Sequence, residues 1–200
     1  SDSRTGRYTL NSISEVSVAE LPSIGAPEGD AISIMLFDFC CLHCRIVQEE
    51  LLTMHDEFTA RKKRLLLLPA PLNSKCNPDL DTSLGPGFEQ ACEYASVMLG
   101  LWRRDPETYW ELLDHLLVPG VFLSLEEVEL LAGGPPEGEV LTWVNRQIRT
   151  GTRVYHETSL STGIPALPMI LDIEGSDSVR TLQGDIDTEK IRSFLLNDPH

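Results

Sequence analysis

Two cysteines separated by two residues, Cys41 and Cys44, constrain what this sequence can fold into more than any other feature. They follow an apolar run from Ile32 to Phe37 that is typical of a buried strand. After them, apolar residues recur at helical spacing: Val47, Leu51, Met54 and Phe58. The pattern predicts a strand that leads directly into a helix, with the cysteine pair in the first turn of that helix.

This position favours a thiolate at the first cysteine. The unpaired amides and the positive end of the helix dipole stabilise negative charge at Cys41, and a protonated His43 would add a positive charge beside it. These effects could lower the Cys41 pKa from roughly 8.5 toward about 3.5–7.5. A stabilised thiolate is also a good leaving group, so a disulfide that contains it is a better oxidant.

The second cysteine completes the pair. Residues three positions apart share one face of a helix, which brings the Cys44 sulfur within bonding range of Cys41. We therefore predict a redox-active Cys41–Cys44 disulfide. A structural disulfide, or two buried thiols, is the alternative interpretation.

The composition indicates which binding partners are excluded and in which kind of cellular compartment the protein works. A formal charge of −15 argues against binding to nucleic acid or to an anionic membrane surface. No apolar run approaches the length of a membrane span. Five cysteines are more typical of an oxidising compartment than of the cytosol, and because five is odd, at least one thiol is free or pairs with another molecule.

The order of the expected elements predicts an α/β fold. Residues 1–30 are polar and rich in turn formers, so we expect a lead-in segment there, with a short edge strand at 8–10. Strands are predicted over four segments: 31–39, 65–68, 166–173 and 179–182. Helices are predicted over 41–61 and after Asp187.

About seventy residues between the second and third of these strands have a helical pattern. Four helices are expected there, including one that starts at Asp105-Pro106, one that starts at Ser124, and a last one closed by Gly151. We therefore expect one α/β domain formed by 31–85 and 162–200, interrupted by an inserted helical subdomain over 86–161.

The residues around the cysteine pair resemble the active-site motif of the DsbA-like thiol-disulfide oxidoreductases of the thioredoxin superfamily. The family pattern Asp-aromatic-x-Cys-Pro-x-Cys-Arg matches Asp38 to Arg45, but Leu42 stands where the pattern has proline, and Cys40 where a noncysteine is usual. The segment from Thr162 to Ala166 is similar to the Gly-Val-Pro-Ala loop that carries the family's cis-proline.

A looser likeness concerns three further segments. They are similar to parts of thioredoxin-like domains that occur alone or fused to vitamin K epoxide reductase-type membrane proteins: Pro71-Leu72, Cys76-Asn77-Pro78 and Ala91 to Ala95. Together the resemblances span about residues 21–196.

The resemblance implies a thioredoxin fold with an inserted helical subdomain, and disulfide exchange with protein substrates. Cys41 would form the mixed disulfide with a client, and Cys44 would resolve it. Pro165 would approach the pair in cis and expose the backbone of Ile164 to an extended client, with Pro168 as a competing candidate inside the strand.

The resemblance also implies the setting in which the protein works. A periplasmic or otherwise extracytoplasmic location is expected, and a membrane redox partner of the vitamin K epoxide reductase type is a possible partner. No cofactor and no metal are expected. Whether the pair acts as oxidant, reductant or isomerase is left open, since Leu42 makes transfer of the family's redox potential unsafe.

The remaining cysteines suggest a second disulfide. Cys76 lies in an expected loop and Cys92 on an expected helix face, so we predict a structural Cys76–Cys92 bridge, with a second redox pair that relays electrons as the alternative. Cys40 is expected as the last residue of a strand, pointing away from Cys41 as an inert thiol, with a backup redox partner as the alternative.

A non-enzymatic interpretation also fits these cysteines. Cys40 and Cys44, with His43 alongside, have the spacing of a copper(I) site in thioredoxin-fold copper-delivery proteins, where His115 or His156 could serve as the distant ligand. The alternatives to an enzyme are therefore a copper(I)-binding protein and a structural thioredoxin-like domain.

Overall fold

The computed structural model describes residues 4–81 and 85–197, and within them the chain forms a mixed sheet of six strands. The spatial order is β1-β6-β5-β3-β4-β2. Only β3 and β4 run parallel, and every other neighbouring pair is antiparallel. The strands are β1 (Arg4–Thr9), β2 (Ser23–Gly25), β3 (Ala31–Phe37), β4 (Lys63–Pro69), β5 (Met169–Ile173) and β6 (Ser178–Gln183).

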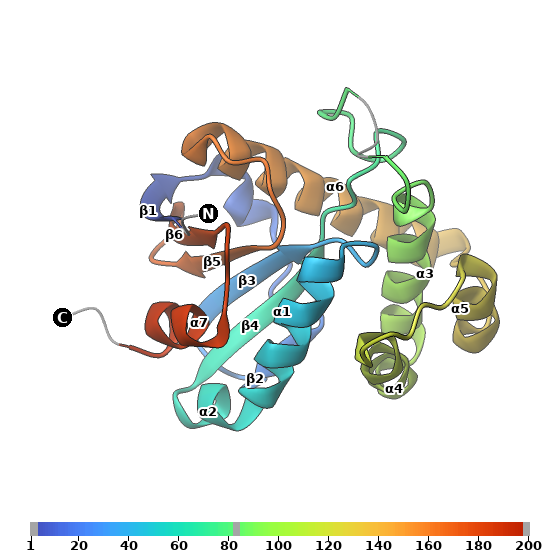
Figure 1. Ribbon diagram of the computed structural model, residues 1–200, viewed down its shortest axis with the longest axis horizontal. Helices are drawn as coiled ribbons and strands as arrows, with labels where there is room; N and C mark the ends of the chain where they lie inside the picture. Colours follow the sequence, from blue (N-terminus) through green and yellow to red (C-terminus); the bar gives the residue numbers. More distant parts are fainter. Residues whose placement is uncertain (1–3, 82–84, 198–200) are drawn as a thin grey trace.

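Helices cover both faces of this sheet (Figure 1). The longest helix, α6, crosses one face, and α1 and α7 lie against the other, while α3, α4 and α5 gather beside the sheet. The α-helices are α1 (Leu42–Thr53), α2 (His55–Ala60), α3 (Ala91–Arg104), α4 (Pro106–Leu117), α5 (Leu125–Ala132), α6 (Gly138–Thr162) and α7 (Thr188–Leu195). This is the predicted thioredoxin fold, with a helical block inserted between β4 and β5.

The central strands each contain a continuous apolar run because both of their faces are covered there. Residues 34–37 of β3, 65–68 of β4 and 169–171 of β5 have no exposed surface. Such continuous runs, without the alternation of a half-exposed strand, are typical of strands between two helical layers. They position the carboxyl end of β3, where the cysteine pair begins.

The first thirty residues contribute more than the predicted lead-in segment. β1 pairs with β6 along its full length, so an edge strand exists as expected, but it spans Arg4–Thr9 and not 8–10. β2 closes the opposite edge against β4. A short 3₁₀ helix, η1 (Asn11–Glu15), connects toward β2. Four apolar side chains of this segment lie in the core, so it belongs to the domain: Leu10, Ile13, Leu21 and Ile24.

The single helix predicted over 41–61 is instead two helices that meet at Met54. The change of direction lets α2 pack against β2. His55 Nδ1 accepts a hydrogen bond of 3.1 Å from the backbone N–H of Gly25, and Phe58 is fully buried. A contact to a strand thirty residues earlier in the chain therefore overrides the continuous helical pattern.

The helix starts predicted at Asp105, Ser124 and Asp187 are confirmed, because each side chain caps the first turn of its helix. The predicted end at Gly151 is wrong. α6 continues to Thr162 and ends at Gly163, which has the left-handed φ of 73°. The expected boundary at residue 161 thus falls inside α6, the helix that crosses the sheet.

Gly151 allows α6 to approach the sheet, since a Cβ atom there would overlap the carbonyl oxygen of Pro69. We expect Gly151→Ala to destabilise the fold by about 2 kcal/mol, because overpacking outweighs the better helix propensity of alanine. Urea denaturation followed by circular dichroism measures this loss. The control Ser161→Ala, at an exposed position of the same helix, should stay within about 0.5 kcal/mol of wild type. Equal stabilities for both variants would contradict the proposed close contact.

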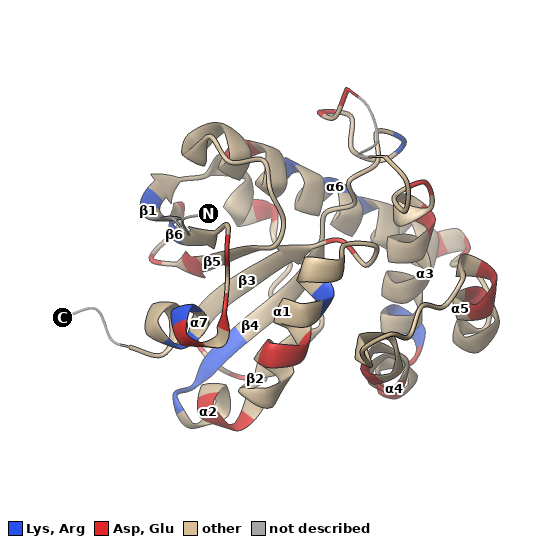
Figure 2. Cartoon of the chain, viewed as in Figure 1, with Lys and Arg blue, Asp and Glu red and all other residues tan. Residues whose placement is uncertain are grey.

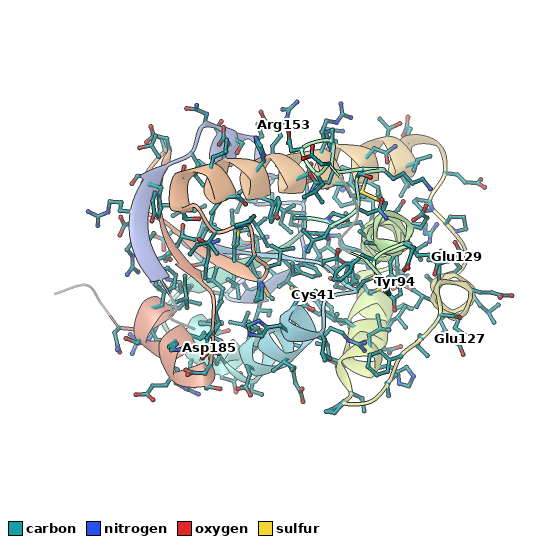
Figure 3. The ribbon with its side chains drawn as sticks, turned by 45° about the horizontal axis from the view of Figure 1, so that its top comes forward. Cys41, Tyr94, Glu127, Glu129, Arg153 and Asp185 are labelled. Atoms are coloured by element: carbon teal, nitrogen blue, oxygen red, sulfur yellow. A yellow bond between two sulfur atoms is a disulfide. The ribbon has the colours of Figure 1, made fainter. Side chains whose placement is uncertain are left out.

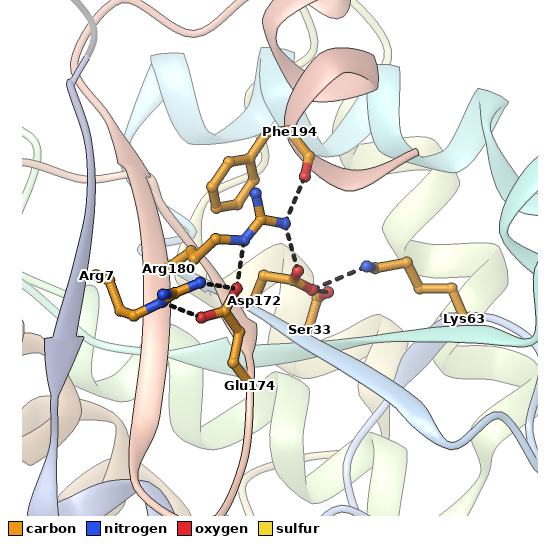
Figure 4. A network of polar contacts seen from close by, with 7 residues as sticks. All are labelled: Arg7, Ser33, Lys63, Asp172, Glu174, Arg180 and Phe194. Atoms are coloured by element: carbon orange, nitrogen blue, oxygen red, sulfur yellow. Dashed lines mark hydrogen bonds and ion pairs between the residues drawn. The ribbon is translucent and has the colours of Figure 1, made fainter. Parts of the chain in front are cut away.

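A charge network joins the strands at the end of the sheet away from the cysteines (Figure 4). The carboxylate of Asp172 in β5 accepts hydrogen bonds from Ser33 (2.6 Å), Lys63 (2.8 Å) and Arg180 (2.7 Å). Burial alone would raise the Asp172 pKa, but these three donors hold it below its usual value. Arg180 also stacks on the ring of Phe194, which ties α7 to the sheet.

The acidic residues are spread over several helices, including α2, α4, α5 and α7 (Figure 2). Among the residues that the structure describes, no helix has the length and apolar character needed to cross a bilayer.

Candidate active site

The cysteine pair occupies the predicted junction between β3 and α1. Cys41 is the N-cap residue of α1 and lies at the start of that helix (Figure 3). Its Sγ accepts a hydrogen bond of 3.2 Å from the backbone N–H of Cys44. Both cysteines are free thiols in this structure. Cys41 is half-buried and Cys44 is fully buried, so the first sulfur is the more accessible one.

The two thiols differ in acidity. The pKa of Cys41 is lowered, chiefly by the hydrogen bond with the Cys44 side chain and also by the backbone N–H groups of Cys44 and His43, which together outweigh burial. The pKa of Cys44 is raised well above its ordinary value by burial and by its contact with Cys41. The helix amides therefore act as the sequence suggested, while the role of the His43 imidazole stays a prediction.

Asp38 is the main site feature that the reasoning from residue patterns missed. Its side chain is 1% exposed, and its two carboxylate oxygens accept backbone hydrogen bonds of 2.7 Å each, from Cys40 and from Leu72. Burial raises the Asp38 pKa, an effect that these two amides oppose. The position of Asp38 in the quoted sequence motif was the only signal that could have identified it.

Cys40 lies in a turn after β3, whereas the sequence placed it at the end of the strand. The reason is that β3 stops at Phe37, and Asp38 then caps the turn by binding the Cys40 amide. Burial, followed by the Asp38 carboxylate, raises the pKa of Cys40 to about 12. Cys40 thus keeps its proton at neutral pH, and its inertness in exchange stays a prediction.

No group of three or more His, Cys, Asp or Glu side chains within residues 4–81 and 85–197 is arranged to hold a metal ion. The copper(I) interpretation, which used Cys40 and Cys44, stays a hypothesis that copper titration can test.

The prediction of a cis bond at Pro165 is wrong. The cis peptide bond found in the described residues is Leu167–Pro168. Strand β5 begins at Met169, later than the predicted 166, so Pro168 precedes the strand and does not lie inside it. Because Met169 pairs with Leu36, Pro168 lies next to the end of β3, which leads into the cysteine pair.

Ile164 and Pro165 make contacts within the chain. The backbone carbonyl of Ile164 accepts a hydrogen bond of 2.9 Å from Gln183, and its N–H donates to the Thr162 hydroxyl. The Pro165 carbonyl accepts from the Tyr155 hydroxyl at 3.0 Å. The backbone of Ile164, predicted to pair with a client, is therefore engaged by the fold itself, because this segment follows directly on the end of α6.

The predicted Cys76–Cys92 disulfide is confirmed, with a Cα–Cα distance of 5.9 Å. It ties the loop after β4 to the first turn of α3. Inside that loop, the Asn73 side chain donates to the carbonyls of Phe88 and Glu89, so hydrogen bonds also join the loop to the residues just before α3.

Arg45 fixes the other side of the site to the helical block. Its guanidinium donates to the carbonyls of Leu116 and Val121 and lies 5.0 Å from the centre of the Phe122 ring. A pocket of about 470 Å³ lies beside these groups and is lined in part by Cys40, Leu42 and Tyr94. The inserted helices therefore form one wall next to the cysteine pair.

The difference in acidity predicts selective alkylation. We expect iodoacetamide at neutral pH to modify Cys41 in preference to Cys40 and Cys44, because the thiolate is the nucleophile and Cys41 has the lowered pKa. As the pH falls through the Cys41 pKa, the rate should decline. Peptide mass spectrometry after short exposure measures this. Faster labelling of Cys40 than of Cys41 would contradict the assignment.

A sheet of this order, with a helix-capping accessible cysteine and a buried cysteine one turn later, defines the class as far as the fold: a thioredoxin-fold protein with a cysteine pair at the start of its first helix. Solved structures agree. The catalytic domain of Proteus mirabilis ScsC has a TM-score of 0.63 at 15% identity, over 91% of this chain and 90% of that one. A periplasmic thioredoxin-like protein from Salmonella enterica serovar Typhimurium has a TM-score of 0.61 at 17% identity, over 90% and 89% of the two chains.

Pseudomonas aeruginosa DsbA2 has a TM-score of 0.53 at 18% identity, covering 86% of this chain and 90% of its own. Identities this low establish the likeness of the fold. No protein-family model and no curated protein sequence matches the chain.

Proposed function

We propose that this protein is a thiol-disulfide oxidoreductase that exchanges disulfides with protein clients through Cys41 and Cys44. The observation that carries the proposal is the contrast between the two sulfurs. Cys41 is accessible and more acidic than an ordinary thiol, while Cys44 is buried and much less acidic. Such a pair separates the attacking sulfur from the resolving one.

In the reducing direction, the Cys41 thiolate attacks one sulfur of a client disulfide. A Cys41–client disulfide forms and the other client sulfur leaves as a thiolate, which takes up a proton. Cys44 then gives up its proton and attacks the Cys41 sulfur, which releases the second client thiolate. The client gains two electrons and the Cys41–Cys44 pair is oxidised to a disulfide; oxidation of a client runs the same steps backward.

The surroundings of the pair support a protein as the client. Leu42, which follows Cys41, is 60% exposed, and Phe122 across the adjoining pocket is 69% exposed, so apolar surface is available beside the accessible sulfur. In this proposal the client segment also contacts residues 163–168, of which Pro168 lies next to the end of β3.

Two observations support a location outside the cytosol for this protein: the Cys76–Cys92 disulfide, and the structural likeness to a protein described as periplasmic. For recycling, a membrane redox partner of the vitamin K epoxide reductase type is the candidate implied by the resemblance in sequence. Re-oxidation of the reduced protein by membranes that contain such an enzyme tests this partner, and no change in its rate over buffer would contradict it.

Trapping tests the main proposal. Cys44→Ser should accumulate a mixed disulfide between Cys41 and a denatured client that carries disulfides, because the Cys41 thiolate attacks a client disulfide, one client sulfur leaves as a thiolate, and the thiol that would resolve the adduct is missing. Non-reducing electrophoresis and peptide mapping detect the adduct. The matched variant Cys40→Ser should release its client as wild type does. Absence of any Cys41 adduct in Cys44→Ser would refute the proposal.

A further inference from the structure

Asp38 joins two segments that meet at the active site. Its Oδ1 binds the amide of Cys40 and its Oδ2 binds the amide of Leu72, both at 2.7 Å, and its backbone carbonyl accepts from the Cys41 amide at 3.1 Å. One buried residue thus holds the turn before Cys41 and the loop that follows β4.

The loop on the Leu72 side is itself held by the Cys76–Cys92 disulfide. The carbonyl of Asn73, the residue after Leu72, accepts backbone hydrogen bonds from Cys76 and Asn77. The sulfurs of Cys76 and Cys92 lie 4.0 and 3.7 Å from that carbonyl oxygen. The residues between the disulfide and Asp38 are buried, with Leu72 4% and Asn73 6% exposed. A continuous series of short contacts therefore runs from the disulfide to the turn before Cys41.

We propose that Asp38 is a positioning residue through which the Cys76–Cys92 disulfide sets the reactivity of Cys41. This inference rests on the proposed function in that it takes Cys41 as the attacking sulfur. The disulfide holds the Asn73 loop, the loop presents the Leu72 amide, and Asp38 uses that amide to keep the turn before α1 in place. This turn then keeps the Cys41 sulfur in position to accept the hydrogen bond from the amide of Cys44.

The direction of the effect follows from this geometry. When the disulfide is removed, the Leu72 amide is held less firmly and the turn gains freedom. The Cys41 sulfur then spends less time at the helix amide, so its thiolate loses stabilisation and its pKa rises. Partial loss of such a helix-end interaction corresponds to a rise of about half a pKa unit.

A double-mutant cycle tests the coupling. The titration of Cys41 is followed by its thiolate absorbance in four proteins: wild type, Cys76→Ser with Cys92→Ser, Asp38→Asn, and the combination. Asparagine can accept only one of the two amides at a time, so it breaks the link. We expect removal of the disulfide to raise the Cys41 pKa in the Asp38 background and to change it much less in the D38N background. Equal shifts in both backgrounds, or no shift in either, would overturn the proposal.

Two controls address the chance that the disulfide-free variant loses its fold. Asn73→Ala keeps the disulfide but loosens the same loop, and should raise the Cys41 pKa by a smaller amount; an unchanged pKa would count against the proposal. Glu157→Gln weakens another carboxylate that joins two segments, through hydrogen bonds from Ser12, and should leave the Cys41 titration unchanged. If the Cys41 pKa rose in E157Q as much as it does when the disulfide is removed, the cause would be a general loosening of the fold. That result would overturn the proposal.

The result is separable from the proposed function. Suppose that wild type fails to exchange disulfides with insulin, but the Cys41 titration still depends on the Cys76–Cys92 disulfide through Asp38. The proposed function is then refuted, and the proposed coupling of the disulfide to Cys41 is supported. If wild type exchanges disulfides with insulin and the Cys41 titration is independent of the Cys76–Cys92 disulfide, the coupling is refuted and the proposed function is supported.

Discussion

Cys41→Ser is expected to lower the rate of insulin reduction by dithiothreitol to that of the uncatalysed reaction, a loss of roughly 10³-fold or more. The reason is that the variant loses the accessible, acidic sulfur, and the remaining sulfur, Cys44, is buried with a raised pKa. The turbidity of precipitating insulin chains, followed over time, measures the rate.

Cys40→Ser is the matched control, since Cys40 is the neighbouring thiol and keeps its proton at neutral pH. Its activity should stay within about threefold of wild type, because an inert thiol contributes little beyond packing. Full activity in Cys41→Ser would show that the nucleophile has been assigned to the wrong residue. Loss of activity in Cys40→Ser alone would favour the alternative in which Cys40 takes part in exchange.

Asp172→Asn is expected to destabilise the fold by about 3–5 kcal/mol, the cost of leaving buried cations without their counter-ion. The side chains of Lys63 and Asp172 are 10% and 13% exposed, and Arg180 binds the same carboxylate. Urea denaturation at neutral pH measures the loss. The control is Glu15→Gln, which breaks the exposed Arg153–Glu15 pair and should cost less than about 1 kcal/mol.

The same carboxylate gives the stability a defined pH dependence. The Asp172 pKa is lower in the folded protein than in the unfolded chain, so its contribution is complete above the unfolded value of about 3.9 and disappears as the pH falls through the folded value. The difference in stability between wild type and Asp172→Asn should therefore shrink in acid. A constant difference would show that Asp172 does not titrate with folding.

The position of the cysteine pair and the lowered pKa of Cys41 could be predicted because their causes are local. The apolar run before Cys41 and the helical spacing after it lie within one continuous stretch, and the helix end that stabilises the thiolate is a property of the backbone. The helix caps at Asp105, Ser124 and Asp187 could be predicted for the same reason, since each side chain binds an amide three residues later.

Predictions that depended on where an element ends were less successful. Gly151 looked like a helix terminator, yet it lies within α6 because the helix must approach Pro69, which is distant in sequence. Pro165 and Pro168 are three residues apart, and only the start of β5, set by its pairing with β3, distinguishes their surroundings.

By itself, therefore, the sequence determined the thioredoxin fold, the place of Cys41 and Cys44 at the start of the first helix, and the partnership of Cys76 with Cys92. Only the tertiary structure decided how Asp38 is used, because its partner Leu72 is 34 residues away and becomes a neighbour through the pairing of β3 with β4. The same holds for the Lys63–Asp172 contact, whose residues are 109 positions apart. Interactions along one helix or strand are encoded by spacing, whereas a buried carboxylate takes its partners from whichever chain segments the packed sheet brings to it.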